Sequence, residues 1–168
     1  MHQMVADASS LILLAKCSLL ETVCRLFEVV IPPTSFKEAA AKDLVKKYPD
    51  AALILELISN GSIVIQNPGK TKLPLSLSIH QGEKEALQLA IKFGRTLLAT
   101  DDGKAIKAAR FLNVPFIITP KLVTELFRLR KISFNKAKNC LEKLKTIGRY
   151  SPEIIADALL SLTEGKDA

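Results

Sequence analysis

Residues 96–110 read TLLATDDGKAIKAAR, and this stretch decides the fold class. The apolar run Leu97-Leu98-Ala99 stops at two adjacent carboxylates, Asp101 and Asp102, and a helical pattern follows at once. A strand that passes directly into a helix is half of a β–α unit, and such units recur along the chain. The sequence therefore predicts an α/β three-layer sandwich with a mainly parallel sheet of roughly five strands, covered by helices on both faces.

The expected strands are short, and most of the expected helices separate them. We predict strands at 4–7, 28–31, 62–66, 96–100 and 115–119. Between them we predict helices at 9–16 and 18–27, a helix capped by Thr34 or Ser35, and helices at 50–59, 82–93 and 102–112. Three further helices follow at 120–130, 134–147 and 151–164. We expect a single domain over residues 1–168, with its core in about 1–119 and extra C-terminal helices in about 120–165.

Composition argues against a disordered chain and against a membrane-spanning protein. The chain has 168 residues, of which 48 % are hydrophobic, so it is long and apolar enough to bury a core. Its apolar runs are far shorter than the roughly 20 residues of a membrane span. The stretch SSLILLAK near the start lacks the basic region and the cleavage site of a signal peptide. We therefore expect a cytoplasmic protein that makes no use of a membrane.

The positive charge is concentrated in one third of the chain. Residues 101–150 hold 12 Lys and Arg against 4 Asp and Glu, whereas the whole chain has a net charge of only +7. A basic surface attracts polyanions, above all nucleic acid, although a solvated surface rich in lysine would look the same. Lys104, Lys107 and Arg110 lie three residues apart on the helix that begins at the acids, so they are candidates for holding RNA phosphates.

Acidic residues gather where strands end or where neighbouring helices begin. Asp7 follows the first strand, Asp101 and Asp102 follow the fourth, and Glu38 and Glu83 lie near helix starts. Any one of these acids could simply cap a helix. Together, however, carboxylates at one sheet edge would repel each other and raise each other's pKa unless a cation lay among them. Carboxylates are the ligands that Mg²⁺ prefers, and with two histidines in the chain no soft-metal site is easily assembled.

Four segments, in this order, resemble the PIN-domain nucleases: VADASSLILLAK, VVIPPTSFKEAA, GEKEALQLA and LLATDDGKAIKAARFLNVP. The likeness is greatest to the small stand-alone prokaryotic branch, in which the third segment starts with Gly-Glu-x-x-Ala. This resemblance implies an endoribonuclease that uses Mg²⁺ or Mn²⁺. Many members of the family are toxins that a small antitoxin protein neutralises, and many are homodimers, so the resemblance also implies an antitoxin partner and a homodimer as expectations for this chain.

The resemblance assigns roles to individual residues. Asp7 matches the first acid of the family, Glu38 the helix acid and Glu83 the third acid, for which Glu85 competes. The fourth acid is Asp101 or Asp102. Ser9 matches a small hydroxyl residue that orients the site, and we give Thr100 the same role.

Two questions stay open at this level. The C-terminal helices carry apolar residues at helical spacing, which could join two chains into a homodimer or simply pack together within one chain. A PIN fold could also be a catalytically inactive module that binds RNA or protein, and an α/β phosphatase of another type is a third possibility. The apolar positions are Phe134, Ala137, Leu141, Leu144, Ile147, Ile154, Ile155, Ala158, Leu159 and Leu162.

Overall fold

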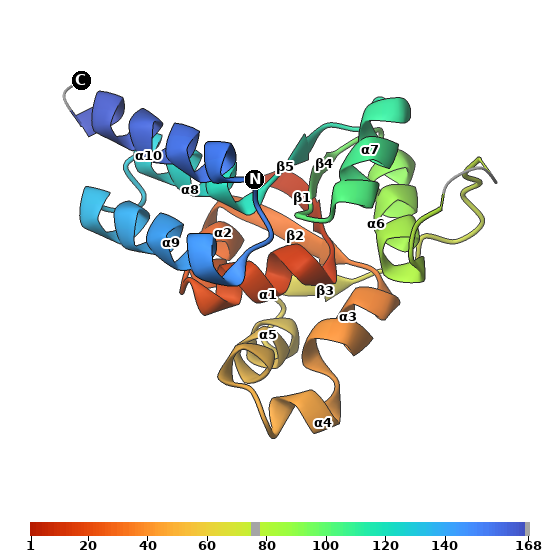
Figure 1. The fold of residues 1–168 in the computed structure, drawn as a ribbon. Coiled ribbons are helices and arrows are strands. Elements are labelled where there is room, and N and C mark those ends of the chain that lie inside the picture. Colours follow the sequence, from red (N-terminus) through yellow and green to blue (C-terminus); the bar gives the residue numbers. More distant parts are fainter. Residues whose placement is uncertain (75–77, 167–168) are drawn as a thin grey trace. The chain divides into compact units, whose positions relative to one another are not determined.

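The computed structural model describes residues 1–74 and 78–166, and Figure 1 shows its elements. The chain divides into two compact units, Met1–Ile117 and Ile118–Ala168, which are described here one at a time. The predicted loop at 67–78 lies partly outside the described residues.

The first unit is built on a five-stranded sheet in which all pairings are parallel. The strands lie in the order β3-β2-β1-β4-β5, so β1 occupies the centre of the sheet. Both the α/β class and the parallel sheet predicted from the sequence are confirmed. The strands are β1 (His2–Ala6), β2 (Phe27–Ile31), β3 (Ile63–Ile65), β4 (Leu97–Ala99) and β5 (Phe116–Ile117).

The central strands are buried on both faces, which is the reason that their sequences are apolar without alternation. Val5 pairs in register with Val30 and Leu98, and these three side chains share one core cluster with residues of α6 (Gln81–Lys92) and α7 (Gly103–Phe111). Because side chains alternate along a strand, the neighbouring residues Met4 and Ala6 point to the opposite face, where they are equally buried.

Helices from the first half of the unit pack with one another. Helix α1 contacts both α3 and α5, and α4 contacts α5. This group and the α6–α7 pair form the two helical layers of the three-layer fold (Figure 1). The helices are α1 (Ala8–Lys16), α2 (Leu20–Leu26), α3 (Pro33–Ala40), α4 (Lys42–Val45) and α5 (Pro49–Ser59).

One detail of the sequence interpretation was wrong. Neither Thr34 nor Ser35 caps α3, because the helix already begins at Pro33, with Pro32 in the N-cap position and no side-chain cap. Proline is well suited to the first helical turn because its missing N–H would have no partner there. The hydroxyl and the N–H of Thr34 donate instead to Glu85 on another helix.

The second unit consists of α8 (Thr119–Arg128), α9 (Phe134–Ile147) and α10 (Pro152–Lys166), and each of these helices contacts the other two. Most of the predicted apolar faces are buried, including Leu141 and Leu144 of α9 and Ile155 of α10. Ile147 and Ile154 remain exposed. Packing among the three helices therefore explains much of the apolar spacing.

The strand order fixes where a ligand would bind in the first unit. The chain builds the sheet outward from β1 through β2 to β3, then returns to the other side of β1 to place β4 and β5. The order therefore reverses between β1 and β4, and open parallel sheets bind ligands beyond the carboxyl ends of the strands at such a switch point. Across residues 1–74 and 78–166, none of the helices has the length and apolar character needed to span a membrane.

Candidate active site

Asp7 lies at the switch point, directly after β1, and is almost entirely buried. It serves as the N-cap of α1, accepting a hydrogen bond of 3.0 Å from the N–H of Ser10 at Oδ1. The Ser9 hydroxyl donates to the same oxygen at 2.7 Å, and the Thr100 hydroxyl donates to Oδ2. Both carboxylate oxygens are thus fixed in direction by neighbouring side chains.

The same two hydroxyl groups also connect Asp7 to the turn after β4. Ser9 Oγ accepts from the N–H of Asp101 at 3.3 Å, and Thr100 Oγ1 accepts from the N–H of Asp102 at 3.3 Å. Main-chain bonds from Asp7 to Ala99 and from Thr100 to Ile117 continue the sheet at this edge. Ser9 and Thr100 therefore tie the ends of β1 and β4 together around the Asp7 carboxylate.

Burial makes Asp7 an unusual carboxylate. Its pKa is raised from 3.8 to about 6, chiefly by loss of hydration on burial and to a smaller extent by the negative charge of Asp101, and this net rise includes the opposing effect of the hydrogen bonds from Thr100, Ser10 and Ser9. The anion is therefore held in a place that favours its neutral form. A cation at this position would reverse that preference.

The two adjacent acids after β4 differ in what their carboxylates do. Asp102 is the N-cap of α7, and its Oδ2 accepts from the N–H of Ala105 at 2.9 Å. Asp101 precedes the cap and is close enough to Asp7 to affect its charge. Asp7 and Asp102 thus both cap helices, and Asp101 is the acid whose negative charge raises the pKa of Asp7.

A second pair of acids forms where α3 and α6 contact each other. Helix α6 precedes β4, so it runs against the strands and begins at the same edge at which they end. Gly82 in its first turn lies against Glu38 of α3, because a Cβ on Gly82 would be 2.9 Å from Glu38 Oε1 and 3.2 Å from Oε2. The Gly-Glu sequence thus has a physical reason, since glycine leaves room for a carboxylate beside Glu83.

Like charge surrounds Glu38. Partial burial raises its pKa, repulsion from Glu83 and Glu85 raises it further, and the nearby His80 lowers it. Glu83 Oε2 is buried and has no hydrogen-bond partner among the described residues. An unpartnered buried carboxylate oxygen is costly, and it is a natural site for a ligand. His80 is the N-cap residue of α6 and directly precedes the Gln81-Gly82-Glu83 turn, and its charge acts on Glu38 from there.

Glu85 has a structural task that separates it from Glu83. Its Oε2 accepts from the Thr34 hydroxyl and from the Thr34 N–H at 3.4 Å, and its Oε1 accepts from Gln81 Nε2 at 3.1 Å. Glu85 therefore ties α6 to the start of α3, which positions Glu38 and Glu83 side by side. Of the two glutamates, Glu83 has the carboxylate with an oxygen left to bind something else.

These side chains have the chemistry of a site for a hard divalent cation, since all their donors are carboxylate oxygens. The sequence predicted one cluster of metal ligands. Over the described residues, however, no three Asp, Glu, His or Cys side chains form a metal-binding group. The acids stand instead as two pairs, Asp7 with Asp101 and Glu38 with Glu83. Carboxylates of like charge repel each other, which favours their separation when no cation lies between them. Their oxygen atoms are suitable ligands for Mg²⁺ or Mn²⁺, but they do not form a complete coordination shell.

The predicted phosphate-binding residues lie on the exposed side of α7. Lys104, Lys107 and Arg110 are all exposed. Lys104 is two residues after the Asp102 cap, whereas Arg110 lies about 12 Å along the helix axis and its guanidinium stacks on the Phe116 ring at 5.2 Å. Proximity to the acids therefore decreases from Lys104 to Arg110.

A family model described as a PIN domain matches residues 3–164, which is nearly the whole chain. No curated protein matches it significantly.

Proposed function

The chain belongs to the PIN-domain family, and on that premise we propose that it is a metal-dependent endoribonuclease that hydrolyses phosphodiester bonds of RNA. PIN domains are generally nucleases. The observation that carries the proposal is the state of Asp7, a buried carboxylate at the switch point of the sheet with a pKa raised to about 6 and Asp101 beside it. Such an arrangement costs stability in the folded chain, and carboxylates with strongly perturbed pKa values are typical of binding and catalytic sites.

Three residues would hold the cation, which would be Mg²⁺ or Mn²⁺. Asp7 and Asp101 offer oxygens at the ends of β1 and β4, and Glu83 offers the buried oxygen that has no partner among the described residues, with Glu38 next to it. Asp102 is the alternative to Asp101 as the acid from the end of β4, and its Oδ2 also caps α7. A divalent cation at such a site activates water and stabilises the negative charge that develops on the phosphate.

The remaining chemistry falls to residues of the chain itself. Ser9 and Thr100 hold the Asp7 carboxylate in one orientation, which preorganises it. Glu38 has a raised pKa and is therefore suited to accept a proton from the attacking water. Lys104, and to a smaller extent Lys107 and Arg110, would bind the phosphates of the RNA on either side of the cleaved bond.

Cleavage of an end-labelled single-stranded RNA tests the proposal. The purified chain is incubated with Mn²⁺, with Mg²⁺ or with EDTA, and the Asp7→Asn variant prepared in parallel reveals any contaminating ribonuclease. We expect endonucleolytic products with the metals only, and only from the wild-type chain. Intact RNA in all lanes, together with binding that is equal in Mn²⁺ and EDTA, would instead identify a catalytically inactive RNA-binding module. Turnover of small phosphate esters would point to a phosphatase.

A homodimer and a small antitoxin partner remain proposals that rest mainly on the family resemblance. The exposed apolar side chains of unit 2, Ile147, Ile154, Leu129 and Leu160, provide the surface that a second copy could cover. Light scattering at moderate salt without RNA should give about twice the 18.4 kDa of one chain, and a mass near 18.4 kDa would rule the dimer out under those conditions. Copurification with the product of an adjoining small gene would test the antitoxin.

A further inference from the structure

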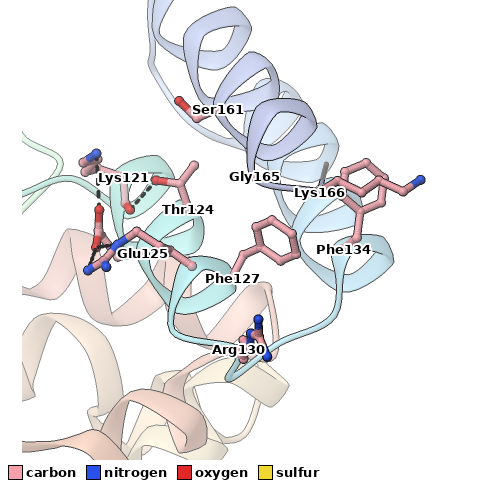
Figure 2. Close-up of a pocket in the computed structure, with 10 residues that line it drawn as sticks. Lys121, Thr124, Glu125, Phe127, Arg130, Phe134, Ser161, Gly165 and Lys166 are labelled. Carbon is pink, nitrogen blue, oxygen red and sulfur yellow. Dashed lines mark hydrogen bonds and ion pairs between the residues drawn. The ribbon is translucent and has the colours of Figure 1, made fainter. Parts of the chain in front are cut away.

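The three helices of the second unit enclose a pocket of about 670 Å³ that the proposed cleavage chemistry does not use. Figure 2 shows the pocket between α8, the start of α9 and the end of α10. This volume is in the range of sites that bind small organic groups. The lining residues are Lys121, Thr124, Glu125, Phe127, Arg128, Arg130, Phe134, Ser161, Gly165 and Lys166.

Two phenylalanine rings form the apolar part of the pocket. Phe127 and Phe134 meet edge to face, with ring centroids 6.0 Å apart. A Cβ on Gly165 would lie 3.2 Å from Phe127 Cε1, so glycine at this position allows α10 to come close to the ring. Both rings are only partly buried, and a partly exposed aromatic face in a pocket is a surface on which another flat ring can stack.

The charged groups around the rings are mostly cationic. Lys121, Arg128, Arg130 and Lys166 line the pocket, against the single acid Glu125. Glu125 is already paired with Lys121 at 3.3 Å and with Arg128 at 2.8 Å. Lys166 Nζ lies 4.4 Å from the centre of the Phe134 ring. The pocket thus places exposed cations around aromatic rings, which is complementary to a group that is flat and negatively charged at its edge.

Arg130 adds an observation on the backbone. Two bonds end α8 in a Schellman motif, from the N–H of Arg130 to Phe127 O at 2.8 Å and from that of Lys131 to Leu126 O at 2.9 Å. Arg130 occupies the left-handed position of this motif, with φ of 57°, where glycine is the preferred residue. The helix end does not require an arginine at this position, and the Arg130 side chain lines the pocket.

From these features we infer that the pocket is a binding site for single-stranded RNA, in which a base stacks on Phe127 and Phe134 and the adjoining phosphates pair with Arg130 and Lys166. Proteins bind single strands without sequence preference through this combination of aromatic platforms and cationic grooves. Lys166 would move from the Phe134 ring to a phosphate as the base enters. The inference rests on the proposed ribonuclease function, to which it adds an RNA contact on the second unit.

Fluorescence anisotropy with a fluorescein-labelled octamer of uridine, in EDTA so that no cleavage occurs, tests the inference on the full chain. The pocket variant combines Arg130→Gly with Lys166→Gln, and its matched control combines Lys145→Gln with Arg149→Gln. Both lose two positive charges, but Lys145 lies about 16 Å along α9 from Phe134, and neither control residue lines the pocket. Arg130→Gly suits the left-handed backbone, so the midpoint of thermal unfolding should not change.

We expect the pocket variant to weaken binding about tenfold or more relative to the control. Its slope of log affinity against log salt should also be smaller, by about 0.7 for each phosphate that the variant no longer binds. Phe134→Leu, which keeps an apolar side chain and all charges, should weaken binding about tenfold, because one base can no longer stack. A duplex of the same length should bind more weakly than the single strand, since its bases are already paired and stacked.

Equal losses in the pocket and control variants, with no effect of Phe134→Leu, would overturn the inference in favour of general charge attraction. Pocket-dependent binding of a labelled hexaglutamate peptide without binding of the RNA would overturn it in favour of an acidic protein partner. Failure of the ribonuclease proposal gives a different result, namely pocket-dependent RNA binding in EDTA but no cleavage with Mn²⁺. If the pocket variants cleave RNA with unchanged kcat/KM, the inference about the pocket is refuted and the ribonuclease proposal stands.

Discussion

The acidic edge of the first unit and the basic pocket of the second use charge in opposite ways. Asp7 is almost fully buried, hydrogen-bonded by two hydroxyl groups and a main-chain N–H, and its pKa is raised by burial. In the pocket, the side chains of Lys121 and Arg128 are 62 % and 68 % exposed, and the pKa of Glu125 is lowered, chiefly by its hydrogen bond to Arg128. One region holds charge at a cost in free energy, whereas the other holds charge in water at little cost.

This difference separates the work that each region can do. A buried carboxylate with a fixed direction suits selective binding of a small cation and chemistry at one point. Exposed cations around aromatic rings suit a long, flexible polyanion, whose binding depends on salt and tolerates sequence changes. We therefore propose that the acids carry turnover and that the pocket carries RNA affinity. Variants that should change only one of these two properties test this proposal.

The largest effect is expected from Asp7→Asn. The variant keeps the size of the side chain but loses a carboxylate oxygen and its charge, so RNA cleavage with Mn²⁺ should fall by about a thousandfold. Binding of labelled RNA in EDTA should stay unchanged, because the pocket is intact. Cleavage is followed by gel and binding by anisotropy. Loss of both properties in a folded Asp7→Asn chain would show that the two regions are not separable.

Glu83→Ala and Glu85→Ala should give contrasting results although the residues are two positions apart. Glu83→Ala removes the unpartnered oxygen, so cleavage should fall by about ten- to a hundredfold with little loss of stability. Glu85→Ala removes the acceptor for Thr34, so the free energy of unfolding should fall by about 1–2 kcal/mol. Denaturant unfolding and cleavage rates distinguish them, and a reversed pattern would make Glu85 the functional acid.

The pH dependence of stability should show the cost of burying Asp7. Its pKa in the folded chain is about 6, against 3.8 as the ordinary value, so the folded state binds the proton more tightly than the unfolded state. The stability that this proton provides is fully present below about pH 4 and is lost as pH rises through about 6. Above that pH, in EDTA, Asp7→Asn should be more stable than wild type by up to about 3 kcal/mol.

The measurement is the difference between the wild-type and Asp7→Asn unfolding free energies from pH 4 to 8. Taking the difference cancels carboxylates such as Glu125, whose lowered pKa acts in the opposite direction. A flat difference curve would contradict the account of Asp7.

The smallest effects are expected on α7. Lys104→Gln should weaken cleavage a few-fold and reduce the salt dependence of RNA affinity by about 0.7 in slope, because the variant binds one phosphate fewer. Arg110→Gln is the matched control, since it removes the same charge from a residue about 9 Å farther along the helix and stacked on Phe116. If the two variants behave alike, the exposed side of α7 acts only through its overall charge.

The sequence was sufficient for the sheet and for the position of most acids. Apolar runs ending at Asp7 and at Asp101 mark strands that enter helices, and parallel strands must end at one edge, so the place of these residues followed from topology. The choice between Glu83 and Glu85 could not be made with the same certainty. It depends on Thr34, which is 51 residues from Glu85 and meets it only in the folded chain.

The rest depended on side-chain packing that no local pattern contains. The charge coupling of Glu38 with Glu83 depends on the contact between α3 and α6, and that of Asp7 with Asp101 depends on the pairing of β1 with β4. The capping of α7 by Asp102 depends on the conformation of its side chain in the folded chain. The pocket is formed by the ends of three helices, and its aromatic residues, Phe127 and Phe134, read in the sequence as ordinary apolar positions of amphipathic helices.

Titration of Mn²⁺ into the metal-free chain by isothermal calorimetry, at a pH above 6, tests most directly whether the acidic edge is a metal site. Wild type should bind the ion with a saturable heat, Asp7→Asn and Glu83→Ala should each weaken that binding by about tenfold or more, and the pocket variant should match wild type. Saturable binding that is the same in wild type, Asp7→Asn and Glu83→Ala, or no binding by the wild-type chain, would contradict the account.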